Sequence, residues 1–255
     1  DTYRGRILGL TGTPPKRGAK ADIVYKYCPV KFTYTVDTAI DDKILNDYEI
    51  HVHTMPLDTR NNIKKESKKT GTWYTSEYKQ YSFWNSKLQN ASSDKEVRFL
   101  RIMRMKTLMS LPSKEKYATH LMNSSTNKCI VFANTKEQAD KLCRYSYYSG
   151  NKKSEDNLQK FKDGTIDRLS CVLQLNEGIN IPNLKEGIIL HSYSNERKSN
   201  QRIGRLLRLN PDEKSIIHIL CYSNTIDETW VKEALSDLDQ SKIAWKQINQ
   251  LQLEL

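Results

Sequence analysis

The chain has 255 residues, of which 37 % are hydrophobic and 28 % are charged, enough apolar material for one large core or two modest ones. No apolar run approaches the roughly 20 residues that cross a bilayer, and no signal-like apolar stretch follows a basic start, so we expect a cytoplasmic protein with no membrane partner. The formal net charge of +11 favours a polyanionic partner such as nucleic acid over a surface that is basic only for solubility.

The cysteines and histidines are scattered along the chain. The five cysteines are odd in number and never form a CxxC pair, which argues against a disulfide framework or a zinc knuckle and for reduced core residues. His51 and His53 would point to one face of a strand, but no third ligand lies near them in the sequence. We therefore predict no metal site.

The first 125 residues have the less regular pattern. The stretch GRILGLTGTPP (5–15) is typical of a strand that ends in a turn, and KFTYTV (31–36) and YEIHVHTM (48–55) alternate as strands do. Residues 59–93 are polar and rich in lysine and aromatic side chains, which predicts an inserted or mobile segment. Residues 94–122 have a helical pattern that Pro112 interrupts.

The remaining residues alternate between β-rich runs and helical patterns, which is typical of an α/β fold with a parallel sheet. The runs with the composition of buried strands are KCIVFAN (128–134), RLSCVLQL (168–175), EGIILHSY (186–193) and SIIHILCYS (215–223).

Helices are predicted between and after these strands. In residues 135–145, Ala139 and Leu142 share one helical face, and in residues 154–164, Ser154 is a possible N-cap and Gly164 ends the helix. The spacing of TIDE (225–228) predicts a capping box that opens a terminal helix. The chain then ends in an amphipathic segment that includes Ile243, Trp245, Ile248 and Leu251.

Four short blocks follow one another in a fixed order: LTGTPP (10–15), IVFANTKEQAD (130–140), LNEGINIPN (175–183) and QRIGRLLRL (201–209). Together they resemble motifs III, IV, V and VI of the superfamily 2 helicases and translocases, and the QRIGRxxR pattern is the most specific. TGTPP and EGINIPN resemble the DNA-directed branch, which includes restriction-enzyme helicase subunits and excision-repair and phage recombination helicases.

The resemblance implies an α/β fold: a RecA-like parallel sheet flanked by helices, which is the second helicase lobe, with an irregular α+β insertion. Five segments follow from it. They are the end of the first RecA-like lobe (1–20), an interlobe connection (21–58), the insertion and a helical segment (59–125), the second RecA-like lobe (126–225) and a C-terminal helical tail (226–255).

Motif VI concentrates arginine between apolar residues. Carried over by position, Arg205 and Arg208 would be arginine fingers, which stabilise the charge that shifts onto phosphoryl oxygens during ATP cleavage. Gln201 would contact the nucleotide side of the cleft, and Gly204 would permit close approach. The alternative is that the two arginines form surface ion pairs.

Motif V would sense nucleotide and strand together. Gly178 would let backbone approach a ligand, with Glu177 and Asn180 as polar neighbours. The family often has Asp where Asn180 stands. A plain structural turn that ends at Pro182 is the alternative reading.

Motif IV ends a strand with Asn134 and Thr135, whose place at the start of a helix suits the binding of a strand phosphate. A capping role for Thr135 is the alternative, and the two roles can coexist. The block YSG (148–150), with Ser149 and Gly150, resembles the family's next block, which usually reads His-Ser-Gly.

Motif III contributes Thr11, Gly12 and Thr13, which would couple the nucleotide state to the strand-binding surface. A bare turn made by glycine and proline is an equal alternative. In the lysine-rich segment 60–85, aromatic side chains among cations could stack on bases, or the segment could pack on its own aromatics.

The sequence contains no Walker A lysine and no DExx carboxylate pair; GTPPKRGAK (12–20) lacks the spacing of a phosphate loop. We therefore expect ATP and Mg²⁺ to be held mainly by a first lobe outside this sequence, and the chain alone to be inactive. The predicted function is the C-terminal motor lobe of an ATP-dependent DNA helicase or translocase. A non-catalytic nucleic-acid-binding or docking domain and an RNA-directed remodeller are the alternatives.

Overall fold

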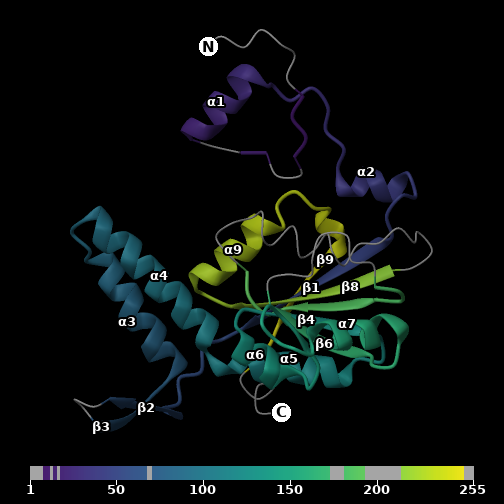
Figure 1. Ribbon diagram of the computed structural model, residues 1–255. Coiled ribbons are helices and arrows are strands. Elements are labelled where there is room, and N and C mark those ends of the chain that lie inside the picture. The colour runs from purple at the N-terminus through teal and green to yellow at the C-terminus, as the bar shows by residue number, and fades with distance from the viewer. Residues whose placement is uncertain are drawn as a thin grey trace.

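The computed structural model describes residues 8–11, 14–15, 18–67, 71–172, 181–192 and 214–249. Within these residues, one seven-stranded sheet has the order β5-β6-β4-β7-β8-β1-β9, and all neighbouring strands are parallel (Figure 1). Its strands are β1 (Asp47–Met55), β4 (Cys129–Ala133), β5 (Ser146–Tyr147), β6 (Arg168–Val172), β7 (Glu186–Ile189), β8 (Lys214–Tyr222) and β9 (Ile243–Gln247). The predicted parallel α/β sheet is confirmed.

The sheet is covered on both faces, which explains why β4, β7 and β8 are buried along nearly their whole length, whereas β1 alternates. In β4, Ile130 and Phe132 join a core cluster that contains residues of α7 (Ser154–Asp163) and α9 (Ile226–Ala234). Val131 and Ala133 join a second cluster with residues of α5 (Pro112–Ser124) and α6 (Lys136–Leu142). The cysteines are free and four of the five are buried, as predicted.

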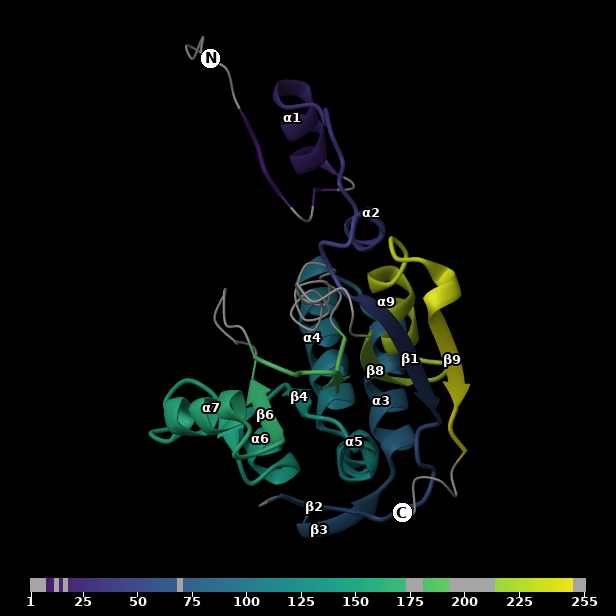
Figure 2. The ribbon, with the colours of Figure 1, turned by 90° about the vertical axis from the view of Figure 1, so that its right-hand side faces the viewer.

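The insertion is more regular than predicted. β2 (Ile63–Ser67) and β3 (Gly71–Thr75) form an antiparallel hairpin, and α3 (Glu77–Gln89) packs against α4 (Asp94–Ser110) beside the sheet (Figures 1 and 2). The predicted helix break is confirmed, because α4 ends at Ser110 and Pro112 is the first residue of α5.

The predicted connection over residues 21–58 needs correction. It contains α1 (Ala19–Tyr27) and α2 (Val36–Asp41), followed by β1, which lies between β8 and β9 in the main sheet. The expected strand at 31–36 does not form; the hydroxyl of Thr35 instead caps α2 by accepting a hydrogen bond from the Thr38 N–H at 3.0 Å. Residues 8–11, the described part of the expected strand before motif III, are not in a strand either.

The helical tail predicted for residues 226–255 is wrong beyond α9. A short 3-10 helix, η1 (Gln240–Lys242), leads into β9, which runs parallel to β1. The spacing of Ile243 and Trp245 fits a strand as well as an amphipathic helix, and pairing with β1 decides between them. Thr225 does cap α9, as predicted, by accepting from the Asp227 N–H at 3.1 Å.

Two end signals of α7 had different outcomes. Gly164 ends the helix in the left-handed region, with φ of 83°, as predicted. The N-cap is Lys153, not Ser154. Ser154 is the first helical residue, and its hydroxyl donates to the Tyr148 carbonyl at 2.8 Å and accepts from the Tyr148 N–H at 3.0 Å. Among the helices in the described ranges, none is long and apolar enough to span a membrane.

Candidate functional site

The candidate site lies where the parallel strands end. Because all seven strands run in one direction, their carboxyl ends share one edge of the sheet, which we call the carboxyl edge. Asn134 and Thr135 directly follow β4, and Ser149 and Gly150 follow β5. Ligands of open α/β sheets commonly bind outside such an edge.

Motif IV forms a well-defined helix start. Thr135 is the N-cap of α6 and accepts a hydrogen bond from the Gln138 N–H at 3.2 Å. In return, the side-chain oxygen of Gln138 accepts from the Asn134 N–H at 3.1 Å. The capping role of Thr135 is therefore confirmed, while its phosphate-binding role stays a prediction.

The YSG block packs against motif IV through one lysine. The Lys136 ammonium lies 5.6 Å from the centre of the Tyr148 ring, and a Cβ added to Gly150 would be 3.5 Å from the same Nζ. Gly150 has a φ of 93°, a backbone conformation that residues other than glycine rarely adopt. Ser149 and Gly150 are exposed. The structure thus brings the two predicted strand-binding blocks together.

Tyrosine stands where the family usually has histidine in this block. The hydroxyl of Tyr148 donates to Asp140 Oδ2 at 2.8 Å, and this hydrogen bond raises the pKa of the phenol. Asp140 also accepts a hydrogen bond from Ser146 Oγ at 2.7 Å. One carboxylate of α6 therefore binds both the first residue of β5 and the residue that follows it.

Most of the predicted nucleotide residues lie outside the described residues. These are Glu177, Gly178 and Asn180 of motif V, Gln201, Gly204, Arg205 and Arg208 of motif VI, and Gly12 and Thr13 of motif III. Thr11 is described and is exposed. The arginine-finger assignment therefore stays a prediction.

The strands before and after motifs V and VI are described and belong to the main sheet. β6 ends at Val172, immediately before motif V, and lies between β5 and β4 in the sheet. β7 and β8, which precede and follow motif VI in the chain, are neighbours. The segments that carry motifs IV and V and the YSG block are thus connected to three adjacent strands.

Sequence reasoning missed a residue that joins two of these strand ends. The amide of Gln138, which is buried, donates to the Met109 carbonyl of α4 at 2.6 Å and lies 3.4 Å from His191 Nε2, just after β7. The Thr-x-x-Gln spacing at 135–138 is a capping-box signal that could have identified it.

A second missed feature is a buried ion pair below the carboxyl end of β8. Lys114 Nζ lies 2.5 Å from Asp227 Oδ2, and both side chains are almost inaccessible. The same carboxylate oxygen accepts from the Tyr222 N–H at 2.9 Å, and the ammonium is 4.9 Å from the centre of the Tyr222 ring. Asp227, which the sequence placed only within the predicted capping box, therefore also neutralises a buried lysine.

Glu77 of α3 links the insertion to this region. Its carboxylate accepts from the Asp58 N–H at 3.0 Å, and from the Ser113 N–H at 2.8 Å and hydroxyl at 2.9 Å. Ser113 Oγ is also 2.8 Å from the Tyr222 hydroxyl. Burial raises the pKa of Glu77, and the three donated hydrogen bonds oppose that rise.

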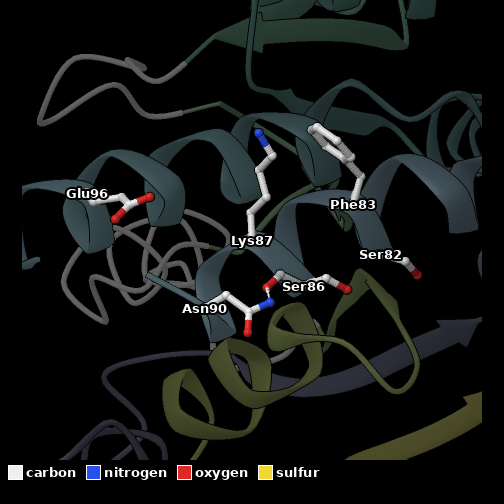
Figure 3. A pocket seen from close by; sticks show the side chains of 6 residues that line it. All are labelled: Ser82, Phe83, Ser86, Lys87, Asn90 and Glu96. Carbon is white, nitrogen blue, oxygen red and sulfur yellow. Dashed lines mark hydrogen bonds between the residues drawn. The ribbon is translucent and has the colours of Figure 1, made fainter. Parts of the chain in front are cut away.

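The aromatic side chains of the insertion are partly exposed. Tyr81 is buried, but Trp73, Tyr74 and Phe83 are 42 %, 61 % and 51 % exposed. Figure 3 shows Phe83 and Lys87 projecting to the same side of α3, above a shallow pocket between α3 and α4, with the ammonium 4.9 Å from the ring centre. Packing of the segment on its own aromatics therefore accounts for only some of them.

Comparisons with known proteins agree with this geometry. Residues 113–210 match the helicase conserved C-terminal domain. The DNA 3'-5' translocase XPB2 of Sulfurisphaera tokodaii is 26 % identical over 235 residues, which cover 84 % of this chain and 52 % of the translocase. The chain therefore spans about half the length of that relative.

Two solved structures are also similar. The ATP-dependent Type ISP restriction-modification enzyme LlaBIII bound to DNA has a TM-score of 0.52 at 17 % identity, covering 89 % of this chain and 17 % of the enzyme. Domain 2 of the DEAD-box helicase Mss116p, bound to an RNA duplex, has a TM-score of 0.47 at 13 % identity, covering 80 % and 66 %. The likeness to LlaBIII supports the fold.

Proposed function

Since the chain contains the C-terminal lobe of a superfamily 2 helicase, we propose that it is the second motor lobe of an ATP-dependent DNA translocase or helicase. The observation that carries this proposal is the convergence of motif IV and the YSG block at one carboxyl edge, within the matched domain. The translocase XPB2 acts on DNA by name, which favours DNA over RNA as the partner.

In this proposal ATP and Mg²⁺ are held mainly by a first lobe, to which residues 1–20 belong. Arg205 and Arg208 stabilise charge on the phosphoryl oxygens, with Gln201 and Gly204 beside the nucleotide. Closure of the cleft brings the two lobes together, and hydrolysis releases them, so that the strand moves relative to the protein.

The strand-binding surface is proposed at the carboxyl edge. It comprises Asn134, Thr135, Ser149 and Gly150. Lys136 directly follows Thr135, and its ammonium, close to Gly150, supplies a positive charge suited to a phosphate. The net charge of +11 adds a sequence-independent attraction for the backbone.

The test is ATP hydrolysis by the full-length protein with and without DNA. Arg205→Ala or Arg208→Ala should lower the DNA-stimulated rate by about 10³-fold or more, because the transition-state charge loses a partner, while ATP binding is preserved. Arg101→Ala, an exposed residue of α4, should keep the wild-type rate. Near-normal turnover by both finger variants would overturn the assignment.

Two further comparisons separate the alternatives. The 255-residue chain alone should hydrolyse no ATP while its full-length parent does so with DNA; activity of the chain alone would place a phosphate-binding site inside it. Stimulation by RNA and not by DNA would indicate a remodeller, and a parent without ATPase activity would indicate a docking domain.

A further inference from the structure

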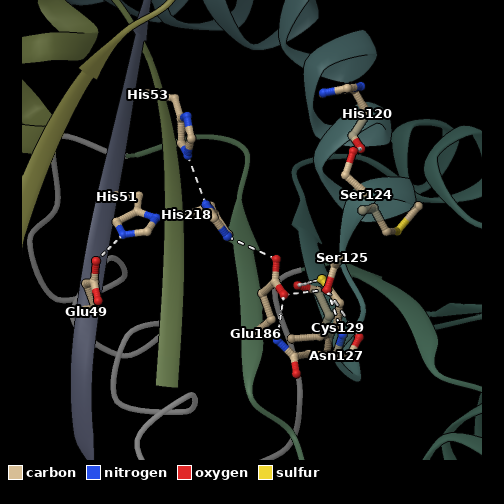
Figure 4. A network of polar contacts seen from close by, with 12 residues as sticks. Glu49, His51, His53, His120, Ser124, Ser125, Asn127, Cys129, Glu186 and His218 are labelled. Atoms are coloured by element: carbon tan, nitrogen blue, oxygen red, sulfur yellow. Dashed lines mark hydrogen bonds and ion pairs between the residues drawn. The ribbon is translucent and has the colours of Figure 1, made fainter. Parts of the chain in front are cut away.

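Three of the five histidines come together on two neighbouring strands of the sheet. His51 and His53 belong to β1, and His218 of β8 is the register partner of His51 (Figure 4). One ring nitrogen from each residue lies within 4.8 Å of the other two. The prediction of no metal site relied on the lack of a third ligand nearby in sequence; strand pairing supplies that ligand from 165 residues beyond His53.

The outward ring nitrogen of each histidine has an oxygen partner. His51 Nε2 is 2.5 Å from Glu49 Oε1, His53 Nδ1 is 3.1 Å from the Tyr117 hydroxyl, and His218 Nε2 is 3.0 Å from Glu186 Oε1. Carboxylates and hydroxyls in these positions orient metal-binding imidazoles and raise their basicity.

The remaining nitrogens face one another or a cation. Because a carboxylate only accepts hydrogen bonds, Glu49 and Glu186 keep the protons of the neutral rings on the two Nε2 atoms. The lone pairs of His51 and His218 are then on Nδ1. His218 Nδ1 is 2.9 Å from His53 Nε2, and His51 Nδ1 is 3.1 Å from the Lys246 ammonium.

These distances suit a small metal ion. Zinc–imidazole bonds of about 2.0–2.1 Å in a tetrahedron place two ligand nitrogens roughly 3.3 Å apart. The His53–His218 pair therefore needs only a slight separation, with the proton of His53 moved to Nδ1, where the Tyr117 oxygen can accept it. His51 is 13 % exposed while its two partners are more buried, so an ion can enter beside it.

The position of Lys246 indicates that a positive charge is favoured next to His51 Nδ1. Its side chain is exposed, on β9 opposite His53, and its ammonium already contacts the inward lone pair of His51. A flexible lysine can leave this position, whereas the ion would gain three fixed ligands and two nearby carboxylates.

We propose that His51, His53 and His218 bind one divalent transition metal ion, with zinc the best match to three imidazoles and an open fourth position for water. The ion would join β1 to β8 across the sheet and add to the stability of the lobe.

Cobalt(II), a spectroscopic substitute for zinc, tests the site in the 255-residue chain. We expect saturable uptake of one ion with tetrahedral d–d absorption, its displacement by zinc, and a higher Tm with zinc. His51→Gln should weaken binding by 10-fold or more, by analogy with the about 10–100-fold effects of altered metal surroundings. His120→Gln, in α5 and outside the cluster, should bind as the wild type does.

Lys246→Met gives a prediction in the opposite direction. Removal of the competing ammonium should tighten binding by several-fold, provided that the variant keeps the wild-type circular dichroism. Absence of stoichiometric uptake, equal affinities in wild type and His51→Gln, or thiolate-to-cobalt charge-transfer absorption from a cysteine such as the half-buried Cys28 would each overturn the proposal.

Discussion

At the scale of single residues, Lys114 places a charged side chain in the interior of the described structure. Its side chain is fully buried, and its charge is balanced by Asp227 at 2.5 Å. A buried charge of this kind is tolerated because its partner is present, and removal of either group leaves the other uncompensated. The pair holds the start of α5 against the start of α9 and the end of β8.

Lys114→Met should therefore lower the free energy of unfolding by about 3–5 kcal/mol, measured by urea denaturation of the chain. The matched control is Lys232→Met. It also removes a lysine that pairs with a carboxylate of α9, but Lys232 is exposed, and its partner is Glu228 at 2.7 Å. We expect the control to unfold at the wild-type urea concentration. Equal shifts in the two variants would show that the buried pair contributes nothing special.

Residue signals that depend on local sequence could be predicted, and those that depend on strand pairing could not. The caps at Thr135 and Thr225 follow from one helical turn of sequence, as does the end at Gly164. The approach of His218 to His51 depends on β1 lying next to β8, and no local pattern encodes that neighbour. The arginines of motif VI lie outside the described residues, so their assignment still rests on the motif.

At the scale of elements, the base of the insertion is fixed by Asp58, three residues after the end of β1. Burial alone would raise the pKa of this carboxyl, but hydrogen bonds from Arg60 and Asn62 lower it to about 2. Arg60 contributes both its backbone N–H, at 2.9 Å, and its guanidinium. The ionised carboxylate therefore stabilises the turn that leads into β2.

This produces a defined acid sensitivity. The pKa of Asp58 is lower in the folded than in the unfolded chain, so its stabilising contribution is complete above about pH 4 and declines as the pH falls towards 2. Between pH 5 and pH 3 the loss of unfolding free energy should be smaller in Asp58→Asn by about 1 kcal/mol.

Arg60→Gln should reduce the same pH dependence, because it removes the main charged partner of Asp58. Lys64→Gln, which disrupts an exposed pair with Glu66 at 2.6 Å on β2, is the control and should follow the wild-type curve. Urea titrations at several pH values provide the measurement. A wild-type pH curve in Asp58→Asn would contradict the assignment.

The sequence was least informative about the insertion and the last strand. β2 and β3 are largely polar, and none of their side chains is fully buried, so the apolar alternation that normally identifies a strand is weak there. β9 is short, and the spacing of its apolar residues suits two kinds of element. In both places pairing with another strand, and not local preference, determines the structure.

At the scale of the whole molecule, the insertion extends away from the sheet (Figure 1). It carries exposed aromatic side chains and exposed lysines. Aromatic rings among cations can stack on bases without sequence preference. If the insertion contacts the strand, the proposed nucleic-acid surface extends from the carboxyl edge to the β2–β3 hairpin.

Trp73→Ala in the full-length protein should then weaken binding of a fluorescent oligo-dT strand by about 5- to 160-fold, in line with about 1–3 kcal/mol for each stacked base. Trp245→Ala on β9 is a matched control, because both tryptophans are 42 % exposed. Fluorescence anisotropy at one fixed salt concentration gives both affinities. Equal losses would assign the effect to general destabilisation.

The order of motifs was sufficient to predict the RecA-like sheet, because motifs IV and V each go with a buried strand of recognisable composition. It did not predict that the sheet recruits β1 from before the insertion and β9 from near the other end of the sequence. In the chain, β1 precedes and β9 follows the lobe predicted over residues 126–225. The sheet of this lobe therefore includes residues on both sides of the predicted bounds.

The position of β1 has a consequence for synthesis of the protein on the ribosome. β1 begins at Asp47, but its partners begin at Lys214 and Ile243, so at about 5–20 residues per second it waits roughly 10–40 s until both have been synthesised. During that interval Tyr48, Ile50 and Val52, which are fully buried in the finished sheet, have no partner strand. The nascent chain thus exposes these apolar residues before their partner strands exist, and slow translation of the last third would lengthen that exposure.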